Sequence, residues 1–177
     1  MHEICAMLLY VLLQDIQHEK QPSSTETTLE LCTSYEYIEH DLFWCFHYLM
    51  KDLGPLYYVE KKDIQEEEET LPPMLSSCHR VRQILSVVDE NTHAHLESLH
   101  IEPQLFCLRW FRLLFSREFH MTDTLVLWDW ILAENYMSKI QPNTDSDSIA
   151  IYMDLITTIE YFSIEMVNVK KKNKKIL

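Results

Sequence analysis

The side chains best suited to catalysis or metal binding in this sequence are nine histidines, five cysteines and 28 carboxylates. Cys78-His79, with His93 and His95 further along, offers the thiolate and imidazole groups that zinc prefers. Zinc modules space their ligands in pairs, and no C-x2-C or H-x3-H pair occurs here. The sequence therefore predicts no metal site, and we expect these histidines to be solvated or hydrogen-bonded.

Motifs that bind phosphate or present a nucleophile need several glycines, because their backbone approaches the ligand closely or adopts a positive φ. One glycine stands among 177 residues, so the sequence excludes G-x-G-x-x-G, the P-loop and G-x-S-x-G. Residues 66–69 are all glutamate, but segment 61–77 has almost no apolar periodicity and would hold an acid–base pair without rigid support. We expect no catalytic residue, no cofactor and no small-molecule substrate.

The charge distribution argues against nucleic acid and anionic membrane surfaces as direct partners. The net charge is −13, and five of the 15 basic residues lie within the last eight positions. Such an acidic body repels phosphate groups, and residues 164–177 are expected to form a basic, disordered tail. An odd number of cysteines without a secretion signal predicts reduced thiols. We expect a cytoplasmic location, including a peripheral one on endomembranes.

Apolar spacing predicts one all-α, multi-helix domain over residues 1–163. The scarcity of glycine leaves few positions for hairpins, and the longest apolar run, 4–13, is too short to cross a bilayer. A helix over 35–53 is expected to stop before Gly54-Pro55, and 61–77 is expected to be an acidic loop. The remaining predicted helices cover 1–16, 80–88, a short stretch after a cap at 89–92, a stretch opening at Pro103, 125–133 and 148–162.

The helix that opens at Pro103 is apolar around nearly its whole circumference, so it is expected to be central in the fold. Arg109 and Trp110 lie on it, and we predict that both are core or ion-pair residues. Trp128 and Asp129 lie on the next predicted helix, where Asp129 is the sole charge between 125 and 133. A buried carboxylate needs a partner, and Arg109 or Arg112 could supply it.

Three stretches carry a family resemblance. Residues 101–110 read I-E-P-Q-L-F-C-L-R-W, 114–119 read L-F-S-R-E-F, and 127–129 read L-W-D. Their order and content closely resemble the TBC (Tre-2/Bub2/Cdc16) domain pattern. Met1-His2-Glu3 is similar to the residues that follow the family's Y-x-Q-G, and together with E-H-D at 39–41 and the acidic loop it resembles the subgroup of TBC domain family member 5.

The resemblance implies an all-helical domain that accelerates GTP hydrolysis by a Rab protein without being a hydrolase itself. Members insert an arginine from I-x-x-D-x-x-R and a glutamine from Y-x-Q into the nucleotide site, and an arginine finger is worth about 10³–10⁵ in rate. Both patterns would lie upstream of Met1, so we expect a fragment, truncated at both ends, that is inactive alone. Its partner would be a GTP-bound Rab, contacted by Met1, His2, Glu3, Arg117 and Glu118.

Two other interpretations remain open. A catalytically dead TBC adaptor would bind a Rab or a trafficking partner without stimulating hydrolysis, and an unrelated helical scaffold would do neither. For residues 1–3, an exposed, frayed terminus is an equally good account. Truncation would also uncover apolar helix faces, so we expect the chain alone to be marginally stable and prone to self-association.

Overall fold

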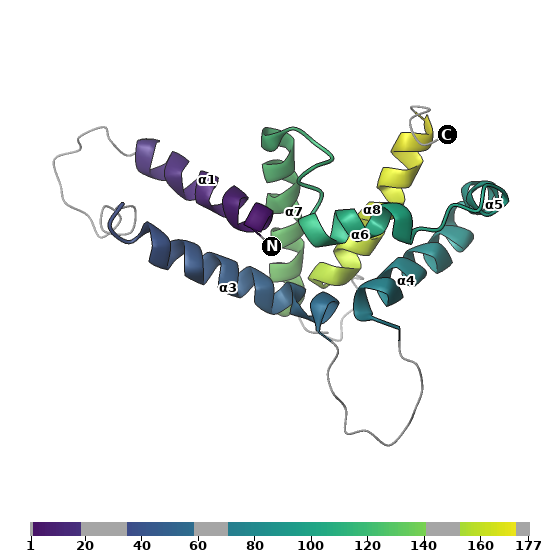
Figure 1. Cartoon of the computed structure of the whole chain (residues 1–177), viewed down its shortest axis with the longest axis horizontal. Coiled ribbons are helices and arrows are strands. Elements are labelled where there is room, and N and C mark those ends of the chain that lie inside the picture. The colour runs from purple at the N-terminus through teal and green to yellow at the C-terminus, as the bar shows by residue number, and fades with distance from the viewer. Residues whose placement is uncertain (1, 19–34, 59–70, 141–152, 173–177) are drawn as a thin grey trace, which may run out of the picture. The chain divides into compact units, whose positions relative to one another are not determined.

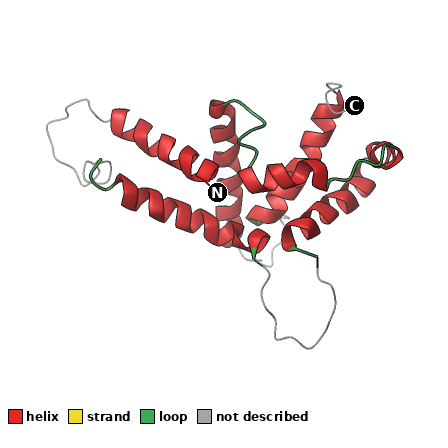
Figure 2. Ribbon diagram, in the orientation of Figure 1, coloured by secondary structure: helices red, strands yellow, loops and turns green. Residues whose placement is uncertain are grey.

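The computed structural model describes residues 2–18, 35–58, 71–140 and 153–172. Every regular element within these ranges is an α-helix, which confirms the all-α prediction (Figure 2). None of the described helices has both the length and the apolarity needed to cross a membrane. The chain divides into two compact units, residues 1–52 and 53–177, and each is described by itself.

The first unit contains α1 (His2–His18) and most of α3 (Ile38–Tyr57). Glu39 and Asp41 occupy the first turn of α3, where a carboxylate stabilises the partial positive charge of the helix dipole. Phe43, Trp44 and Tyr48 stand exposed along the same helix, with the Phe43 and Trp44 ring centroids 5.5 Å apart. This unit therefore presents an aromatic surface on α3.

Helix α3 continues through Gly54 and Pro55, so the prediction that it stops at residue 53 is wrong. A proline removes one backbone hydrogen bond from a helix interior, but here it lies in the last turn. That turn closes with a bond from the Tyr58 N–H to the Gly54 carbonyl oxygen at 3.1 Å. Leu53 and Leu56 on this turn are buried, and their burial offsets the missing bond.

The described residues of the second unit form the end of α3 and five further helices. Helix α4 packs against α5, α6 and α8, and α8 also packs against α6 and α7 (Figure 1). The core therefore lies between α4 and α8, with α6 held by both. The five helices are α4 (Pro73–Val88), α5 (Glu90–Ser98), α6 (Gln104–Leu113), α7 (Met121–Ile140) and α8 (Leu155–Lys172).

Helix starts in this unit follow local capping chemistry. Helix α4 begins at Pro73 rather than at residue 80, because a proline's fixed φ suits the first helical position. The predicted loop 61–77 therefore ends by residue 72, while its residues 61–70 lie outside the described ranges. The predicted cap before α5 is confirmed, since the Thr92 N–H donates to Asp89 Oδ1 at 2.9 Å. Helix α7 extends beyond the predicted 125–133 at both ends.

Helix α8 differs most from the sequence prediction. It begins at Leu155, where the Asp154 carboxylate accepts a hydrogen bond from the Thr157 N–H at 2.7 Å, and it continues to Lys172. Lys171 Nζ lies 2.6 Å from Thr92 Oγ1, on α5. The prediction of a disordered tail is therefore wrong for residues 164–172, because its lysines bind groups of this unit. Residues 173–177 lie outside the described part of the chain.

A left-handed corner joins α6 to the segment that leads into α7. Leu114 has φ 46° and ψ 48°, and Phe115 has φ 60°. Bulky residues rarely adopt this region, which costs about 1–2 kcal/mol per residue. The N–H groups of both residues donate to the Trp110 carbonyl oxygen, that of Phe115 at 3.1 Å. The corner thus ends α6 without a glycine.

Aromatic side chains hold the corner from two sides. Trp128 Nε1, on α7, donates to the Leu114 carbonyl oxygen at 2.8 Å in a buried hydrogen bond. The Phe115 ring lies 4.8 Å from that of Phe162, on α8, in an edge-to-face arrangement, and 5.9 Å from that of Trp110. The favourable packing of these aromatic rings offsets the conformational cost of the left-handed backbone angles.

Replacing Trp128 with phenylalanine should destabilise the protein by about 1–3 kcal/mol, because the buried Leu114 carbonyl would lose its donor. The matched control is Trp130→Phe on the same helix, where the side chain is 47% exposed against 5% for Trp128. The control should change the free energy of unfolding by less than about 0.5 kcal/mol. Chemical denaturation measures both, and equal effects would contradict the role assigned to the hydrogen bond.

Candidate functional site

Glu118 of the R-E-F segment lies between two cations. Lys170 Nζ, on α8, donates to Glu118 Oε2 at 2.7 Å, and the Arg109 guanidinium, on α6, pairs with Oε1. The Glu118 side chain is 6% exposed. Lys170 also lies over the Trp110 ring, 4.9 Å from its centroid, which adds a cation–π contact. The exposed arginine of L-R-W and the buried acid of R-E-F are therefore partners in one ion pair.

The environment of Glu118 favours its charged form. Burial by itself raises the pKa of this carboxyl, but the hydrogen bond and charge of Lys170, followed by the charge of Arg109, outweigh it and lower the pKa overall. A negative charge is thus kept below the surface between α6 and α8. The Glu118 carboxylate is paired within the fold, and its contact with a partner stays a prediction.

A second buried carboxylate ties α4 to α8. Glu160 is 4% exposed in its side chain and accepts both Arg80 Nε, at 3.0 Å from Oε1, and Arg80 Nη2, at 2.6 Å from the same oxygen. Arg80 Nη2 also donates to Ser77 Oγ at 2.9 Å. The hydrogen bonds to Glu160 raise the pKa of Arg80 further. No sequence pattern indicates this pair, because residues 80 and 160 lie far apart in the chain.

The remaining predicted contact residues fall in different parts of the chain. His2 and Glu3 begin α1 in the first unit, with His2 Nε2 3.9 Å from Glu3 Oε1 and the histidine almost fully exposed. Met1 lies outside the described residues. Arg117 is exposed in the segment between α6 and α7 of the second unit. The binding role of Met1, His2, Glu3 and Arg117 stays a prediction.

The prediction that Asp129 is a buried ion-pair residue is wrong. Asp129 is exposed on α7, and Arg109 pairs with Glu118 instead. Trp128 and Trp110 lie in the core, at 5% and 0% exposure. The buried face of α7 is formed by Thr124, Trp128, Ile131 and Asn135, which turns residue 129 toward solvent. Replacing Asp129 should therefore cost well under 1 kcal/mol.

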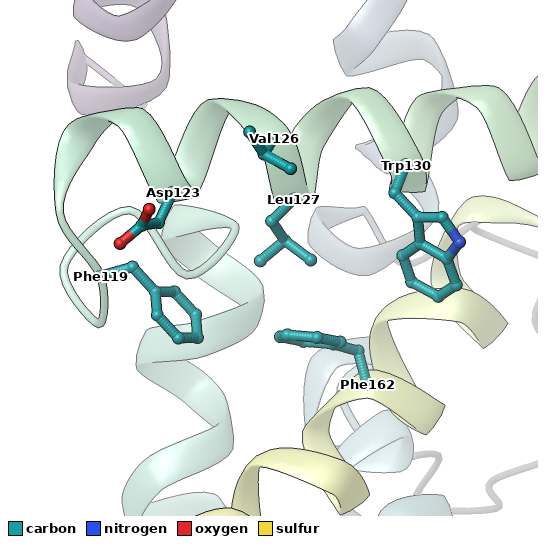
Figure 3. A pocket seen from close by; sticks show the side chains of 6 residues that line it. All are labelled: Phe119, Asp123, Val126, Leu127, Trp130 and Phe162. Carbon is teal, nitrogen blue, oxygen red and sulfur yellow. The ribbon is translucent and has the colours of Figure 1, made fainter.

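An apolar groove of about 380 Å³ opens beside α7 and α8 (Figure 3). Phe119, Val126, Leu127 and Trp130 line it together with Phe162, whose ring lies 6.3 Å from those of Phe119 and Trp130. Asp123 stands at its edge. Periodicity could not reveal this face, because residues 125–133 are apolar on all sides except at Asp129.

Metal binding finds no support within the described ranges. No group of three or more histidine, cysteine, aspartate or glutamate side chains there is placed to hold an ion.

Replacing Glu118 with glutamine should destabilise the protein by about 1–3 kcal/mol at neutral pH, because Lys170 and Arg109 lose their charged acceptor. Since folding lowers the pKa of Glu118, its contribution is complete above the ordinary value of 4.5 and disappears as the pH falls through the lower folded-state value. The gap between wild type and variant should therefore close as the pH falls below 4.5. Denaturation at several pH values measures the gap.

The control for this experiment is Glu165→Gln, which removes an exposed carboxylate from α8. It should leave the free energy of unfolding within about 0.5 kcal/mol at every pH. A Glu118→Gln deficit that stays constant from neutral to acid pH would contradict the ionic role of Glu118.

The sequence of this chain is similar to those of known proteins, and the similarity includes the motifs at 101–129. A sequence model of the Rab-GTPase-TBC domain matches residues 1–164. Human TBC1 domain family member 5 is 33% identical over an alignment of 153 residues, which covers 76% of this chain and 19% of that protein. TBC1 domain family member 5 homolog B of Dictyostelium discoideum is 49% identical over 57 residues, 32% of this chain and 6% of that protein.

A further relative carries an activity in its name. GTPase-activating protein GYP1 of Saccharomyces cerevisiae is 27% identical over 97 residues, 55% of this chain and 14% of that protein. No solved structure matches the chain. The chain spans about a fifth of the length of its human relative. Because the family match covers most of the 177 residues, the chain belongs to the Rab-GTPase-TBC domain family, as its motifs at 101–129 predict.

Proposed function

We propose that this chain is part of a GTPase-activating protein for a Rab-family small GTPase. The observation that carries the proposal is the linked set of motifs, in which Arg109 pairs with Glu118 and Trp128 binds the Leu114 carbonyl oxygen. These contacts support a packed TBC-type unit. The yeast relative named as a GTPase activator supports the same function.

The 177 residues would contribute recognition rather than hydrolysis. Neither I-x-x-D-x-x-R nor Y-x-Q occurs among them, and these are the patterns from which the family supplies its arginine and glutamine. Phosphoryl transfer depends almost entirely on positioning and charge stabilisation by such groups. The chain would therefore regulate a GTPase without being a hydrolase, and it would be inactive without those two side chains.

The proposed partner is the GTP-bound form of a Rab, and exposed His2 and Arg117 are our candidates for contact with it. A net charge of −13 disfavours nucleic acid as a second partner. We propose a cytoplasmic location, with peripheral attachment to endomembranes through the Rab. Vesicle trafficking is the process in which such an activator would act.

A catalytically dead adaptor is the second candidate. The groove beside Phe162 fits it too, because an apolar surface with exposed Val126 and Trp130 suits protein contact whether or not hydrolysis is stimulated. The two candidates differ in the gene, which either encodes Y-x-Q-G in frame before Met1 or does not. They also differ in activity, because a protein extended upstream through Y-x-Q-G should accelerate GTP hydrolysis by a Rab if it is an activator and should not if it is an adaptor.

Single-turnover GTP hydrolysis by a panel of purified Rab proteins tests the proposal. With the 177-residue chain added, each rate should stay within about a factor of a few of its intrinsic value, because the arginine and glutamine are absent. At least one Rab loaded with a non-hydrolysable GTP analogue should bind the chain more tightly than its GDP form. Calorimetry measures the binding.

Two results would overturn the proposal. A hundredfold acceleration by the chain alone would show that other residues supply the catalytic groups. If the chain bound no Rab more tightly in the analogue-loaded form than in the GDP form, a GTP-bound Rab would not be its partner. The Arg117→Ala and Asp129→Ala variants form a matched pair of exposed charges in the second unit, and only the first should weaken binding.

A further inference from the structure

A second hollow extends the apolar groove beside α7 and α8. It has a volume of about 150 Å³, and its lining includes Val88 of α4, Tyr161 and Glu165 of α8, and the ring pair Trp130 and Phe162. The same ring pair lines the groove in Figure 3, with the two ring centroids 6.3 Å apart. The two hollows therefore meet at these rings and form one surface of the second unit, which we call the extended groove.

The apolar side chains of the extended groove are open to solvent. Val126 is 69% exposed, Val88 58% and Trp130 47%. Burial of apolar surface is favourable, and a contiguous exposed apolar surface commonly marks a contact site. A partner that covers these side chains would gain free energy.

A carboxylate stands at each end of the extended groove. Asp123 lines only the larger hollow and Glu165 only the smaller one, and both residues are exposed. Figure 3 shows Asp123 beside Phe119, at the end away from Trp130. Among the described residues that line the two hollows, none is lysine, arginine or histidine. The surface therefore complements a ligand with an apolar middle and a cation at each end.

These charges distinguish between possible occupants. A second copy of the chain would bring two more carboxylates to the same surface, and each copy carries a net charge of −13, so the copies would repel each other. Helices that lie on membranes use lysine and arginine to attract anionic lipids, and the ends of this groove carry the opposite charge. A basic segment of another protein suits the surface better than either.

The apolar floor favours a helical segment over an extended one. Phe119, Leu127 and Phe162 offer no partner for a peptide N–H or carbonyl group, and a buried backbone group without a partner is costly. An α-helix satisfies these groups internally. Its residues at i, i+3 or i+4, and i+7 lie along one face. Seven residues of helix span about 10 Å, which is also the rise along α7 from Asp123 to Trp130.

We propose that the extended groove binds an amphipathic α-helix of another protein, flanked by basic residues. Its apolar residues at i, i+3 or i+4, and i+7 fill the two hollows, and lysine or arginine beyond each end pairs with Asp123 and Glu165. The smaller hollow accommodates one aromatic or branched side chain, since a cavity of about 150 Å³ can hold benzene. Binding at this surface requires neither a Rab nor GTP.

The test selects peptides from a phage-displayed library of random sequences about 16 residues long, or roughly four helical turns. The full chain is the target, and phage that bind its Val126→Lys variant are removed first. Selected sequences should share apolar residues at i, i+3 or i+4, and i+7, with lysine or arginine beyond both ends. A library that yields no binders, or binders without this spacing and these flanks, would overturn the proposal.

Variants then locate the site of a selected synthetic peptide, whose Kd is measured by fluorescence anisotropy. Val126→Lys should weaken binding at least about tenfold, because it removes apolar surface and repels the basic flanks. The matched control is Val87→Lys, since Val87 is 85% exposed on α4 and lines neither hollow. The control should change the Kd by less than about twofold, and equal effects of the two lysine variants would contradict the assigned site.

Removal of the two carboxylates tests the charge complementarity. The double variant Asp123→Asn with Glu165→Gln should weaken binding of the same peptide by about threefold or more, and high salt should reduce this difference. An unchanged Kd would contradict the assigned pairing. Circular dichroism checks that each variant keeps its helices.

The other two occupants are tested with the chain alone. Light scattering that showed a wild-type dimer, dissociated by Val126→Lys, would overturn the proposal in favour of a second copy. Wild-type chain that sedimented with phosphatidylcholine vesicles, when Val126→Lys does not, would overturn it in favour of a lipid surface. The proposal expects neither result.

Discussion

The left-handed corner at Leu114 and Phe115 is the constraint on which the second unit depends. Two bulky residues in this conformation are unfavourable alone, and the chain adopts it because several groups satisfy it together. The Trp110 carbonyl accepts both N–H groups, and Trp128 donates to the Leu114 carbonyl oxygen. Phe115 is thereby placed against Phe162, so that α6, α7 and α8 all meet at one backbone turn.

The motifs that identify the family act largely to stabilise the fold of the second unit. L-R-W supplies Arg109, L-F-S-R-E-F supplies the corner and Glu118, and L-W-D supplies the indole that binds the corner. Lys170 completes the arrangement from α8. The Glu118 and Trp128 side chains are paired inside the unit, whereas Arg117 and part of the groove beside Phe162 are exposed.

Sequence reasoning succeeded where the determining interactions are local. The Asp89 cap depends on a residue three positions away, and the all-α fold follows from a near absence of glycine. It failed where tertiary contacts decide. Pro55 stays in a helix because its neighbours are buried, Lys170 is ordered by Glu118, and Asp129 faces solvent because α7 buries another face. Candidate contact residues came from the family resemblance, and the burial of Glu118 could not be read from periodicity.

Solvent exchange of the indole N–H protons tests the central claim most directly. The chain has four tryptophans, and Trp128 and Trp130 differ by two positions on one helix. If the Trp128 proton is held by the Leu114 carbonyl, its exchange measured by NMR should be slower than that of half-exposed Trp130 by about a hundredfold or more, since exchange requires opening of the buried corner. Equal exchange rates for Trp128 and Trp130 would show that the corner is not held as described.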